Sequence, residues 1–490
     1  MTIGTLPDDA LLKIFKIFVV DAMDYDDTAF NEWHTLVHVC RRWRNLAFSF
    51  PRHLNLQLFC SLPERSAKGT LDIWPESLPI YIHHSDFSWP DSPPEDTRDY
   101  VVAALRLNHR VSGIHLKETL DSAWKRFEPL MQHPFPSLTH LWLDPFDPIK
   151  VSRSFLGGSA PRLQEFDMTQ VTFPALPKLL LSATNLVLLW YDHVPRPGYI
   201  SPQAMINGIS ALIRLRTLSL TFLKFQPPLD TAIKIPSPHM RTLLPALLHL
   251  SFQGFAEYME VLVAHIDAPL LQNIEIKLFH QEVLEVSELA KFVRRSDKLS
   301  LADRAKVTFD SDRILFALTV DPSLLVECHL NFGHKILLLE LECYEWEFRP
   351  SYLAHFCASC FPTFSPFKAL CIGSRTGRIG RWRRVIDDLD VPWLELLRLF
   401  NTVKHLCLLD NVAHWVAQGL RGLPAEWVTE VLPAMDAVFI RHLEPFGPET
   451  EAISEFADAR QLSGCPVSIR DLWEWYTRMD YKETDRGVDG

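Results

Sequence analysis

The residues best suited to chemistry are the cysteines in the last third of the chain. Cys357 and Cys360 form a CxxC pair, and Cys343, His355 and Cys371 lie near it in the sequence. A structural zinc site needs four ligands at short spacing, usually from two such pairs. Because only one CxxC pair is present and one of the other cysteines falls inside an apolar strand pattern, we predict buried thiols and no metal ligands here.

Two further stretches contain residues that bind ligands in other proteins. Residues 373–384 are rich in glycine and arginine but lack the GxxxxGK[ST] spacing of a phosphate-binding loop, so we expect a solvated loop, with an anionic partner as the alternative. His83 and His84 with Asp86 resemble a ligand cluster, which a loop beside a strand explains equally well. No GxSxG or HExxH motif occurs. The sequence favours a non-catalytic protein without a cofactor; an enzyme built on the Cys/His cluster at 343–371 is the alternative.

A recurring apolar pattern organises the body of the chain. It consists of an apolar residue, two free positions, an apolar residue, one free position and a final apolar residue. Successive copies between residues 111 and 271 begin 27, 25, 23, 29, 32 and 24 residues apart, and the next gap of 65 residues leaves room for about two more, one of them near Ala305–Phe309. The copies are Val111-Ile114-Leu116, Leu138-Leu141-Leu143, Leu163-Phe166-Met168, Leu186-Leu189-Tyr191, Leu215-Leu218-Leu220, Leu247-Leu250-Phe252, Leu271-Ile274-Ile276, Ile336-Leu339-Leu341, Phe367-Leu370-Ile372, Val403-Leu406-Leu408 and Met435-Val438-Ile440.

A proline precedes five of these copies by two residues. Proline at this position ends the preceding helix or loop and favours an extended chain. A short strand with a long return cannot bury its apolar edge alone, whereas stacked copies can. We therefore predict an α/β protein whose body is an irregular leucine-rich-repeat solenoid, or horseshoe; a leucine-rich α/β domain without repeats is the alternative. The prolines are Pro136, Pro161, Pro245, Pro269 and Pro433.

Two amphipathic helices are predicted near the N-terminus. Pro7 suits a first helical turn, and Thr5 with Asp8 forms a plausible capping pair. Leu11, Ile14, Phe15 and Phe18 would share one face of the first helix, and Leu36, Val39, Cys40, Trp43, Leu46 and Phe50 one face of the second, opposite Arg41, Arg42 and Arg44. Two short helices with so much apolar surface need a third element or a partner chain.

Leu6-Pro7, the helix that follows and Val39-Cys40-Arg41-Arg42-Trp43-Arg44 together resemble an F-box, the adaptor-binding module of ubiquitin ligases. Residues 427–435 and 457–467 are similar to the ending of a large group of fungal F-box proteins, which follow the F-box with degenerate leucine-rich repeats. Residues 19–33 are longer than the usual connection between these F-box helices. The resemblance implies an F-box at 1–60, a target-binding repeat domain at 61–470, and a C-terminal extension with a polar tail at 471–490.

The resemblance also implies a function, that of the substrate-recognition subunit of an SCF-type cullin–RING ubiquitin ligase. The F-box would bind a Skp-family adaptor, and through it the cullin and RING subunits, while the repeats bind a protein target. Such a subunit supplies proximity and orientation and needs no catalytic residue. A non-degradative scaffold or regulatory protein is the alternative. The expected adaptor-binding residues are Leu6, Pro7, Leu11, Ile14, Phe15, Val39, Cys40 and Trp43.

The free positions of each copy predict the target-binding surface. Strand alternation points them away from the apolar core, toward the concave side of a solenoid. Trp142 and Trp190 would be its aromatic anchors unless loops cover them. The predicted residues are His140, Trp142, Glu165, Asp167, Trp190, Asp192, Thr217, Ser219, His249, Ser251, Asn273 and Glu275.

Composition narrows the class of partner. The formal charge is −11 and no large basic domain is present, which argues against nucleic acid and anionic membranes. An apolar fraction of 47% is typical of a folded protein, and no apolar run of about 18 residues predicts a spanning helix. Nine cysteines within apolar segments and an N-terminus without signal-peptide features favour a cytoplasmic or nuclear protein with reduced thiols.

Overall fold

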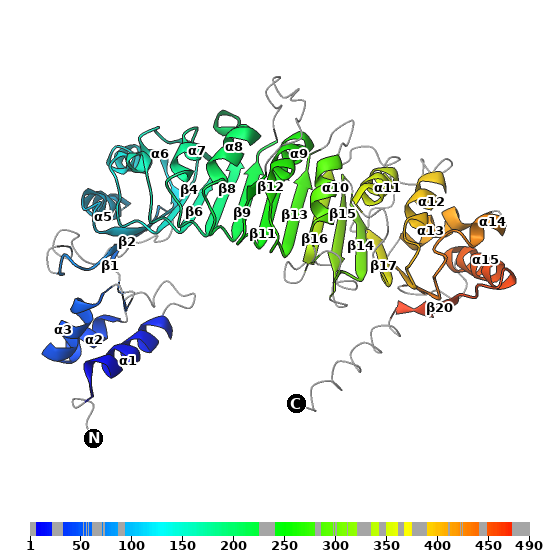
Figure 1. Ribbon diagram of the computed structural model, residues 1–490, viewed down its shortest axis with the longest axis horizontal. Coiled ribbons are helices and arrows are strands. Elements are labelled where there is room, and N and C mark those ends of the chain that lie inside the picture. Colours follow the sequence, from blue (N-terminus) through cyan, green and yellow to red (C-terminus); the bar gives the residue numbers. More distant parts are fainter. Residues whose placement is uncertain are drawn as a thin grey trace. The chain divides into compact units, whose positions relative to one another are not determined.

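A computed structural model of the chain combines helices with large sheets, and it divides into two compact units, Met1–Phe225 and Gln226–Gly490 (Figure 1). Each unit is mixed α/β. The residues that the structure describes are 6–21, 33–51, 53–54, 56, 58–60, 71, 74–86, 94–224, 241–279, 286–296, 298, 301–310, 312–320, 335–342, 349–360, 367–374, 390–409, 412–421, 423, 425–440 and 448–472. The acidic stretch expected between the N-terminal helices falls mainly outside them.

The first unit begins with three short helices, α1 (Asp8–Asp21), α2 (Trp33–Val39) and α3 (Arg41–Ser49). The prediction of one continuous second helix is wrong, because the chain is extended at Cys40 (φ −161°, ψ 169°). The Trp43 N–H donates a hydrogen bond to the Cys40 Sγ over 3.5 Å. Cys40 is therefore the N-cap of α3, and it supplies a first acceptor to a helix start without acidic residues.

A shared apolar core holds these helices together. Leu11 and Phe15 of α1 are fully buried in it, and the Phe15 ring meets Trp43 edge-on at 4.8 Å between ring centroids. The same core includes Leu36, Val37, Leu46, Ala47, Leu54, Leu56 and Leu78. The third helix and the chain after it thus cover much of the apolar surface that two helices alone would leave exposed.

The sheet of the first unit is parallel throughout its described strands. Its strands follow in space the order in which they occur in the sequence: β1 (Leu58–Cys60), β2 (Ile80–Ser85), β3 (Val111–Thr119), β4 (His140–Pro145), β6 (Glu165–Thr169), β8 (Leu188–Val194) and β9 (Thr217–Phe222). A small outer pair is formed by β5 (Ile149–Lys150) and β7 (Val171–Thr172). Parallel neighbours require a return segment for each strand. These returns contain α5 (Pro94–Arg106), α6 (Asp121–Phe127), η3 (Leu130–Gln132), η4 (Phe155–Gly158), α7 (Leu176–Leu180), η5 (Arg196–Gly198) and α8 (Pro202–Ile209).

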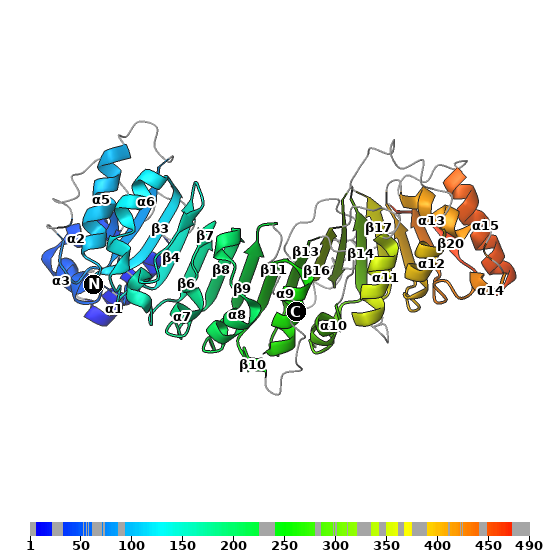
Figure 2. The same ribbon diagram turned by 90° about the horizontal axis from the view of Figure 1, so that it is seen from above.

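Helices α6, α7 and α8 lie along the same side of this sheet (Figures 1 and 2). The apolar residues of the repeated pattern are buried: Leu141, Phe166, Leu189 and Leu218 all have no exposed surface. Along β4 and β6, buried and half-buried residues alternate. The structure therefore confirms the predicted strand positions in this unit and the burial of the pattern residues on them.

The prolines before the strands occupy one repeated backbone turn. Pro161 is the second residue of a turn in which the Leu163 N–H donates to the Ala160 carbonyl oxygen over 3.1 Å. Proline is favoured at this second position because its fixed φ matches the turn. The corresponding hydrogen bonds join Leu138 to Phe135, Leu247 to Leu244, Leu271 to Ala268 and Met435 to Leu432, around the other four prolines.

In the second unit the spatial order of the strands departs from the sequence order. The order is β11 (His249–Gly254), β13 (Asn273–Leu278), β16 (Lys335–Glu342), β15 (Arg313–Thr319), β14 (Arg304–Phe309), β17 (Ala369–Ser374), β18 (His405–Leu408), β19 (Ala437–Ile440) and β20 (Ser468–Asp471). Strand β15 is antiparallel to both of its neighbours. The expected extra repeat at Ala305–Phe309 is thus one strand of an antiparallel β14–β15 pair, and the repeat is interrupted there.

Helices accompany the strands of the second unit as well (Figure 2). They are α9 (Ala256–His265), α10 (Ser287–Arg294), α11 (Arg349–Cys360), α12 (Asp390–Arg398), α13 (Val412–Leu420), α14 (Ala425–Val428) and α15 (Pro448–Leu462), and β10 (Thr242–Leu243) pairs with β12 (Ile266–Asp267) outside the main sheet. Among the described helices of the chain, none combines the length and the apolar character needed to cross a bilayer.

Arg460 of α15 connects the two C-terminal segments on which the resemblance partly rests. Its side chain is fully buried and donates to the carbonyl oxygens of Val428, Val431, Leu432 and Pro433 over 3.0–3.3 Å. These carbonyls belong to the end of α14 and the turn before β19, where the backbone leaves acceptors without helical partners. The guanidinium therefore attaches α15 to the segment at 427–435.

Candidate functional site

The free positions of neighbouring strands in the first unit form straight rows across the sheet. One row contains His83, His115, Trp142, Asp167, Trp190 and Ser219, each paired in register with the next. We call these six residues the central row. They lie on the face opposite the buried leucines, because adjacent residues of a strand point to opposite sides.

The residues predicted for the target surface occupy this face to different extents. In the first unit His140, Trp142, Glu165, Asp167, Trp190, Asp192 and Thr217 are half-buried, and Ser219 is buried. In the second unit His249 and Glu275 are exposed, Ser251 and Asn273 are half-buried, and Ser251 pairs in register with Glu275. The structure thus brings the predicted residues of each unit onto adjoining strands.

Aromatic and imidazole rings contact one another at steep angles along one half of the central row. The His115 ring centroid lies 4.7 Å from that of His83 and 4.7 Å from that of Trp142. Burial, together with the neighbouring charges of His83 and Lys117, lowers the pKa of His115 to about 3. His115 is therefore neutral near pH 7. It was absent from the prediction, although its position in the Val111-Ile114-Leu116 copy corresponds to that of Trp142.

In the other half of the row, Asp167 has the carboxylates of Asp144 and Asp192 nearby. Burial, followed by the charges of Asp192 and Asp144, raises the pKa of Asp167 to about 7. Burial also raises the pKa of Asp144. The Ser219 hydroxyl donates to Asp192 Oδ1 over 2.8 Å. Asp144 was also missed, although it follows its copy at the same position as the predicted Asp192.

The two tryptophans differ in their local contacts. The Trp142 Nε1 atom is buried and has no hydrogen-bond partner in the described part of the chain. A buried N–H without an acceptor is costly, typically about 1–3 kcal/mol, so such a group is rare unless something else binds it. Trp190 is half-buried on β8, two strands away. Both indoles remain partly accessible.

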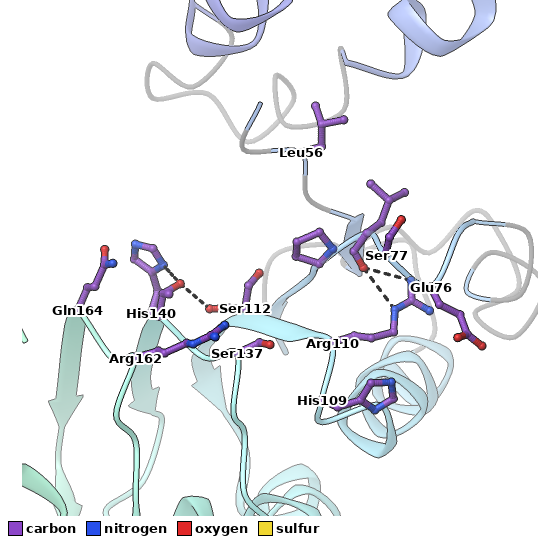
Figure 3. A pocket seen from close by; sticks show the side chains of 13 residues that line it. Leu56, Glu76, Ser77, His109, Arg110, Ser112, Ser137, His140, Arg162 and Gln164 are labelled. Atoms are coloured by element: carbon purple, nitrogen blue, oxygen red, sulfur yellow. Dashed lines mark hydrogen bonds between the residues drawn. The ribbon is translucent and has the colours of Figure 1, made fainter. Parts of the chain in front are cut away.

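A cavity of about 440 Å³ opens at the beginning of these strands (Figure 3). The Arg110 guanidinium donates to the Leu78 and Pro75 carbonyl oxygens, which makes it part of the wall. The Thr139 hydroxyl lies 2.8 Å from His140 Nδ1. Since His140 belongs to the predicted surface as well, the cavity adjoins it. The lining residues are Leu56, Glu76, Ser77, Leu78, Pro79, His109, Arg110, Ser112, Ser137, Thr139, His140, Arg162 and Gln164.

The residues predicted to bind an adaptor divide into two groups. Leu11 and Phe15 are fully buried between the helices, and Leu6 and Trp43 are partly buried against the same core. Pro7, Ile14, Val39 and Cys40 are exposed. On α1 the exposed Ile14 is joined by Ile17 and Phe18, with exposed fractions of 41%, 64% and 39%. Ile17 was missed by the prediction, which assigned a single apolar face to this helix.

The arginines after Cys40 form hydrogen bonds that join the helices α1, α2 and α3, which we call the helical module. Arg42 donates to the Leu6 carbonyl oxygen and to Asp8 Oδ1, both over 2.6 Å, and thereby joins the start of α1 to α3. Arg44 donates to the Val37 carbonyl oxygen over 2.9 Å at the end of α2. Their positions account structurally for the arginine-rich part of the motif.

The candidate metal ligands do not converge in the described part of the chain. Cys357 and Cys360 are buried on α11, where burial raises both thiol pKa values, whereas His355 is exposed. Cys371 is buried in β17, and Cys343 lies outside the described residues. Among the described residues, no group of three or more His, Cys, Asp or Glu could hold a metal ion. Most of the glycine- and arginine-rich stretch, 375–384, also lies outside them.

The His84–Asp86 pair is integrated into the fold. Asp86 accepts hydrogen bonds from Arg98 at 2.8 Å and from the Leu120 N–H at 2.7 Å, and it lies 3.4 Å from His84 Nε2. Burial lowers the pKa of His84. These contacts join β2, α5 and the end of β3, so the pair has a structural role.

Comparison of the chain with protein-family models and with curated protein sequences found no match. Its class is therefore defined by the fold and the surfaces above: a mixed α/β protein with large, mainly parallel sheets, an N-terminal helical module with an exposed apolar stripe, and a polar sheet face.

Proposed function

We propose that this protein is the target-recognition subunit of an SCF-type cullin–RING ubiquitin ligase. In this proposal the helical module α1–α3 is an F-box that binds a Skp-family adaptor, and the parallel sheets form an irregular leucine-rich-repeat solenoid whose polar face binds a protein target. The observation that carries the proposal is that α1 is apolar on two faces, one buried in its own core and one exposed.

The exposed face has the spacing of a docking surface. Ile14, Ile17 and Phe18 are three and four residues apart, so they lie together on one side of a helix. Burying one such side chain against a partner stabilises a complex by roughly 1.5–3 kcal/mol. A contiguous apolar stripe surrounded by polar surface is typical of a protein–protein interface. A Skp-family adaptor is the partner that the F-box resemblance implies.

The sheet architecture supports the second half of the proposal. Parallel strands linked by short helical returns expose one continuous face, which suits binding of an extended surface on another protein. Half-buried tryptophans on that face are residues of the kind that anchor interfaces. The proposed role requires proximity between the target and the ligase, so the chain itself needs no nucleophile or metal.

Co-expression with a Skp-family adaptor tests the adaptor interface. The full-length chain should co-purify with it, and Ile17→Asp should weaken the complex at least about tenfold, because a charge would replace a buried apolar contact. Replacing Leu6 and Pro7 with alanine should also weaken it, since both lie where α1 begins. Lys13→Ala, an exposed substitution on the same helix, is the control. Failure of the wild-type chain to co-purify would remove the F-box assignment. The full chain is used because Leu78, beyond the predicted boundary at 60, packs in the module's core.

Target capture tests the sheet face. Proximity labelling with the wild-type chain should identify candidate targets, and Trp142→Ala with Trp190→Ala should reduce their recovery while adaptor binding persists. A reconstituted ligase should then ubiquitinate a recovered target. If the target binds without being ubiquitinated, a non-degradative scaffold is the better description of the function.

A further inference from the structure

We propose that Trp142, Asp167 and Trp190 form a cage for a lysine or arginine side chain of the protein target. This inference rests on the proposed function, because it specifies the chemistry of the target that binds the same face. It goes beyond that function because it states which kind of target side chain these three residues bind.

The backbone register places these residues side by side. Trp142 on β4 pairs with Asp167 on β6, and Asp167 pairs with Trp190 on β8. Neighbouring strands lie about 4.8 Å apart, so the two indoles start from backbones roughly 10 Å apart, with the carboxylate between them. All three side chains are half-buried on the same face. A cation that reaches Asp167 from solvent therefore passes between two aromatic side chains.

Electrostatics favours a cation at this position. Asp144 and Asp192 lie close enough to disfavour ionisation of Asp167, and Asp167 itself has no ion-pair partner in the described ranges. Glu165 adds a further carboxylate on the same strand, while Lys117 lies near Asp144 and His115 is neutral. An incoming ammonium or guanidinium would relieve the repulsion among the carboxylates. A phosphate or another anion would increase it.

The flanking groups complement a peptide rather than a bare ion. Indole faces attract cations and are the strongest aromatic partners for lysine and arginine. A hard metal ion would instead require six or more oxygen ligands. The combination of one carboxylate with two flanking indoles fits a basic side chain of a polypeptide.

Fluorescence anisotropy with the full-length protein tests the cage. The probes are four labelled twelve-residue Gly-Ser peptides that carry Lys, Arg, Gln or Glu at three central positions. The Lys or Arg peptide should bind at least about tenfold more tightly than the Gln peptide, and the Glu peptide should not bind. Asp167→Asn should lower the affinity at least about fivefold. The matched control Asp147→Asn removes an exposed carboxylate after β4 and should change it less than about twofold.

A second pair of variants tests the aromatic contribution. Trp190→Phe should keep most of the affinity, whereas Trp190→Leu should lose most of it. Leucine is close to phenylalanine in size but has no π face. Thermal unfolding verifies that each variant is folded. The proposal is overturned if neither the Lys nor the Arg peptide binds more tightly than the Gln peptide, or if a folded Asp167→Asn protein keeps wild-type affinity. If Asp167→Asn does not fold, equal affinities of the Phe and Leu variants overturn it.

Adaptor co-purification from the same preparations separates the two proposals. Loss of peptide binding with intact adaptor binding would refute the cage and leave the ligase assignment standing. Peptide binding without adaptor binding would refute the ligase assignment and leave the cage.

Discussion

Asp167 illustrates at the residue scale how a candidate binding group can lower stability. The pKa of its carboxyl is raised from 3.8 to about 7 by burial and by Asp192 and Asp144. Between these two pH values the folded protein holds a proton that the unfolded chain has released. Stability should therefore fall as pH rises from about 4 to about 7 and change little above that range.

Asp167→Asn should remove this dependence. We expect the variant to unfold at a higher temperature than the wild type at pH 8, where the wild-type carboxyl is charged, and at a similar temperature near pH 4, where it is protonated. Thermal unfolding followed by circular dichroism at both pH values measures the difference. A variant that is less stable than the wild type at pH 8 would show that Asp167 makes a stabilising contact in its charged form.

Arg460 gives the opposite prediction for a buried charge. Arg460→Met would leave the carbonyl oxygens of Val428, Val431 and Pro433 without their donor, each at a cost of about 1–3 kcal/mol. We expect a total loss of at least about 3 kcal/mol, measured by urea unfolding. Arg421→Met is the control, because it removes an exposed ion pair with Glu455 and should have little effect. Equal losses from the two variants would contradict the assigned role.

At the scale of elements, the turn before β8 lacks the proline found in the equivalent turns, and introducing it should stabilise the protein. Thr184 occupies the position that proline takes elsewhere, in the turn closed by the Leu186 N–H and the Ala183 carbonyl oxygen at 2.9 Å. Thr184→Pro should raise the free energy of unfolding by about 0.4–1 kcal/mol, because proline restricts the unfolded chain. Asn185→Pro, one position later, should destabilise, since proline is disfavoured there and the Asn185 bond to the Pro161 carbonyl would be lost. Urea unfolding of both variants measures the contrast.

The sequence predicted the elements well wherever one face of a strand is polar. The apolar pattern located β3, β4, β6, β8, β9, β11 and β13, and strand alternation gave the side on which Trp142 and Asp167 lie. The pattern also located β17, β18 and β19, which are buried almost throughout. It did not predict the antiparallel strand β15, because a pattern of apolar positions carries no information on strand direction. The break at Cys40 was also missed, because the apolar spacing continues across it and only the backbone angles reveal the cap.

At the scale of the whole molecule, the two proposed interfaces should respond differently to salt. The chain carries a formal charge of −11, and the cage adds local carboxylates, so a basic peptide should associate faster at low ionic strength. Raising NaCl from about 0.05 M to 0.5 M should slow its association about tenfold, whereas the apolar stripe of α1 should bind the adaptor almost equally at both. Stopped-flow kinetics for the peptide and titration calorimetry for the adaptor measure these responses. Equal salt sensitivity of the two interfaces would argue against the assigned chemistries.

The spacing between strands also determines which residues of a bound peptide can contact the in-register rows. Strands recur about every 4.8 Å across the sheet, whereas a polypeptide in the polyproline II conformation advances about 3.1 Å per residue with three residues per turn. Three ligand residues therefore span nearly the same distance as two strand spacings. Trp142 and Trp190 are separated by two such spacings. A peptide in this conformation that runs across the strands would turn every third side chain toward the sheet, once for every two strands, so targets of this face should carry their contact residues with a period of three.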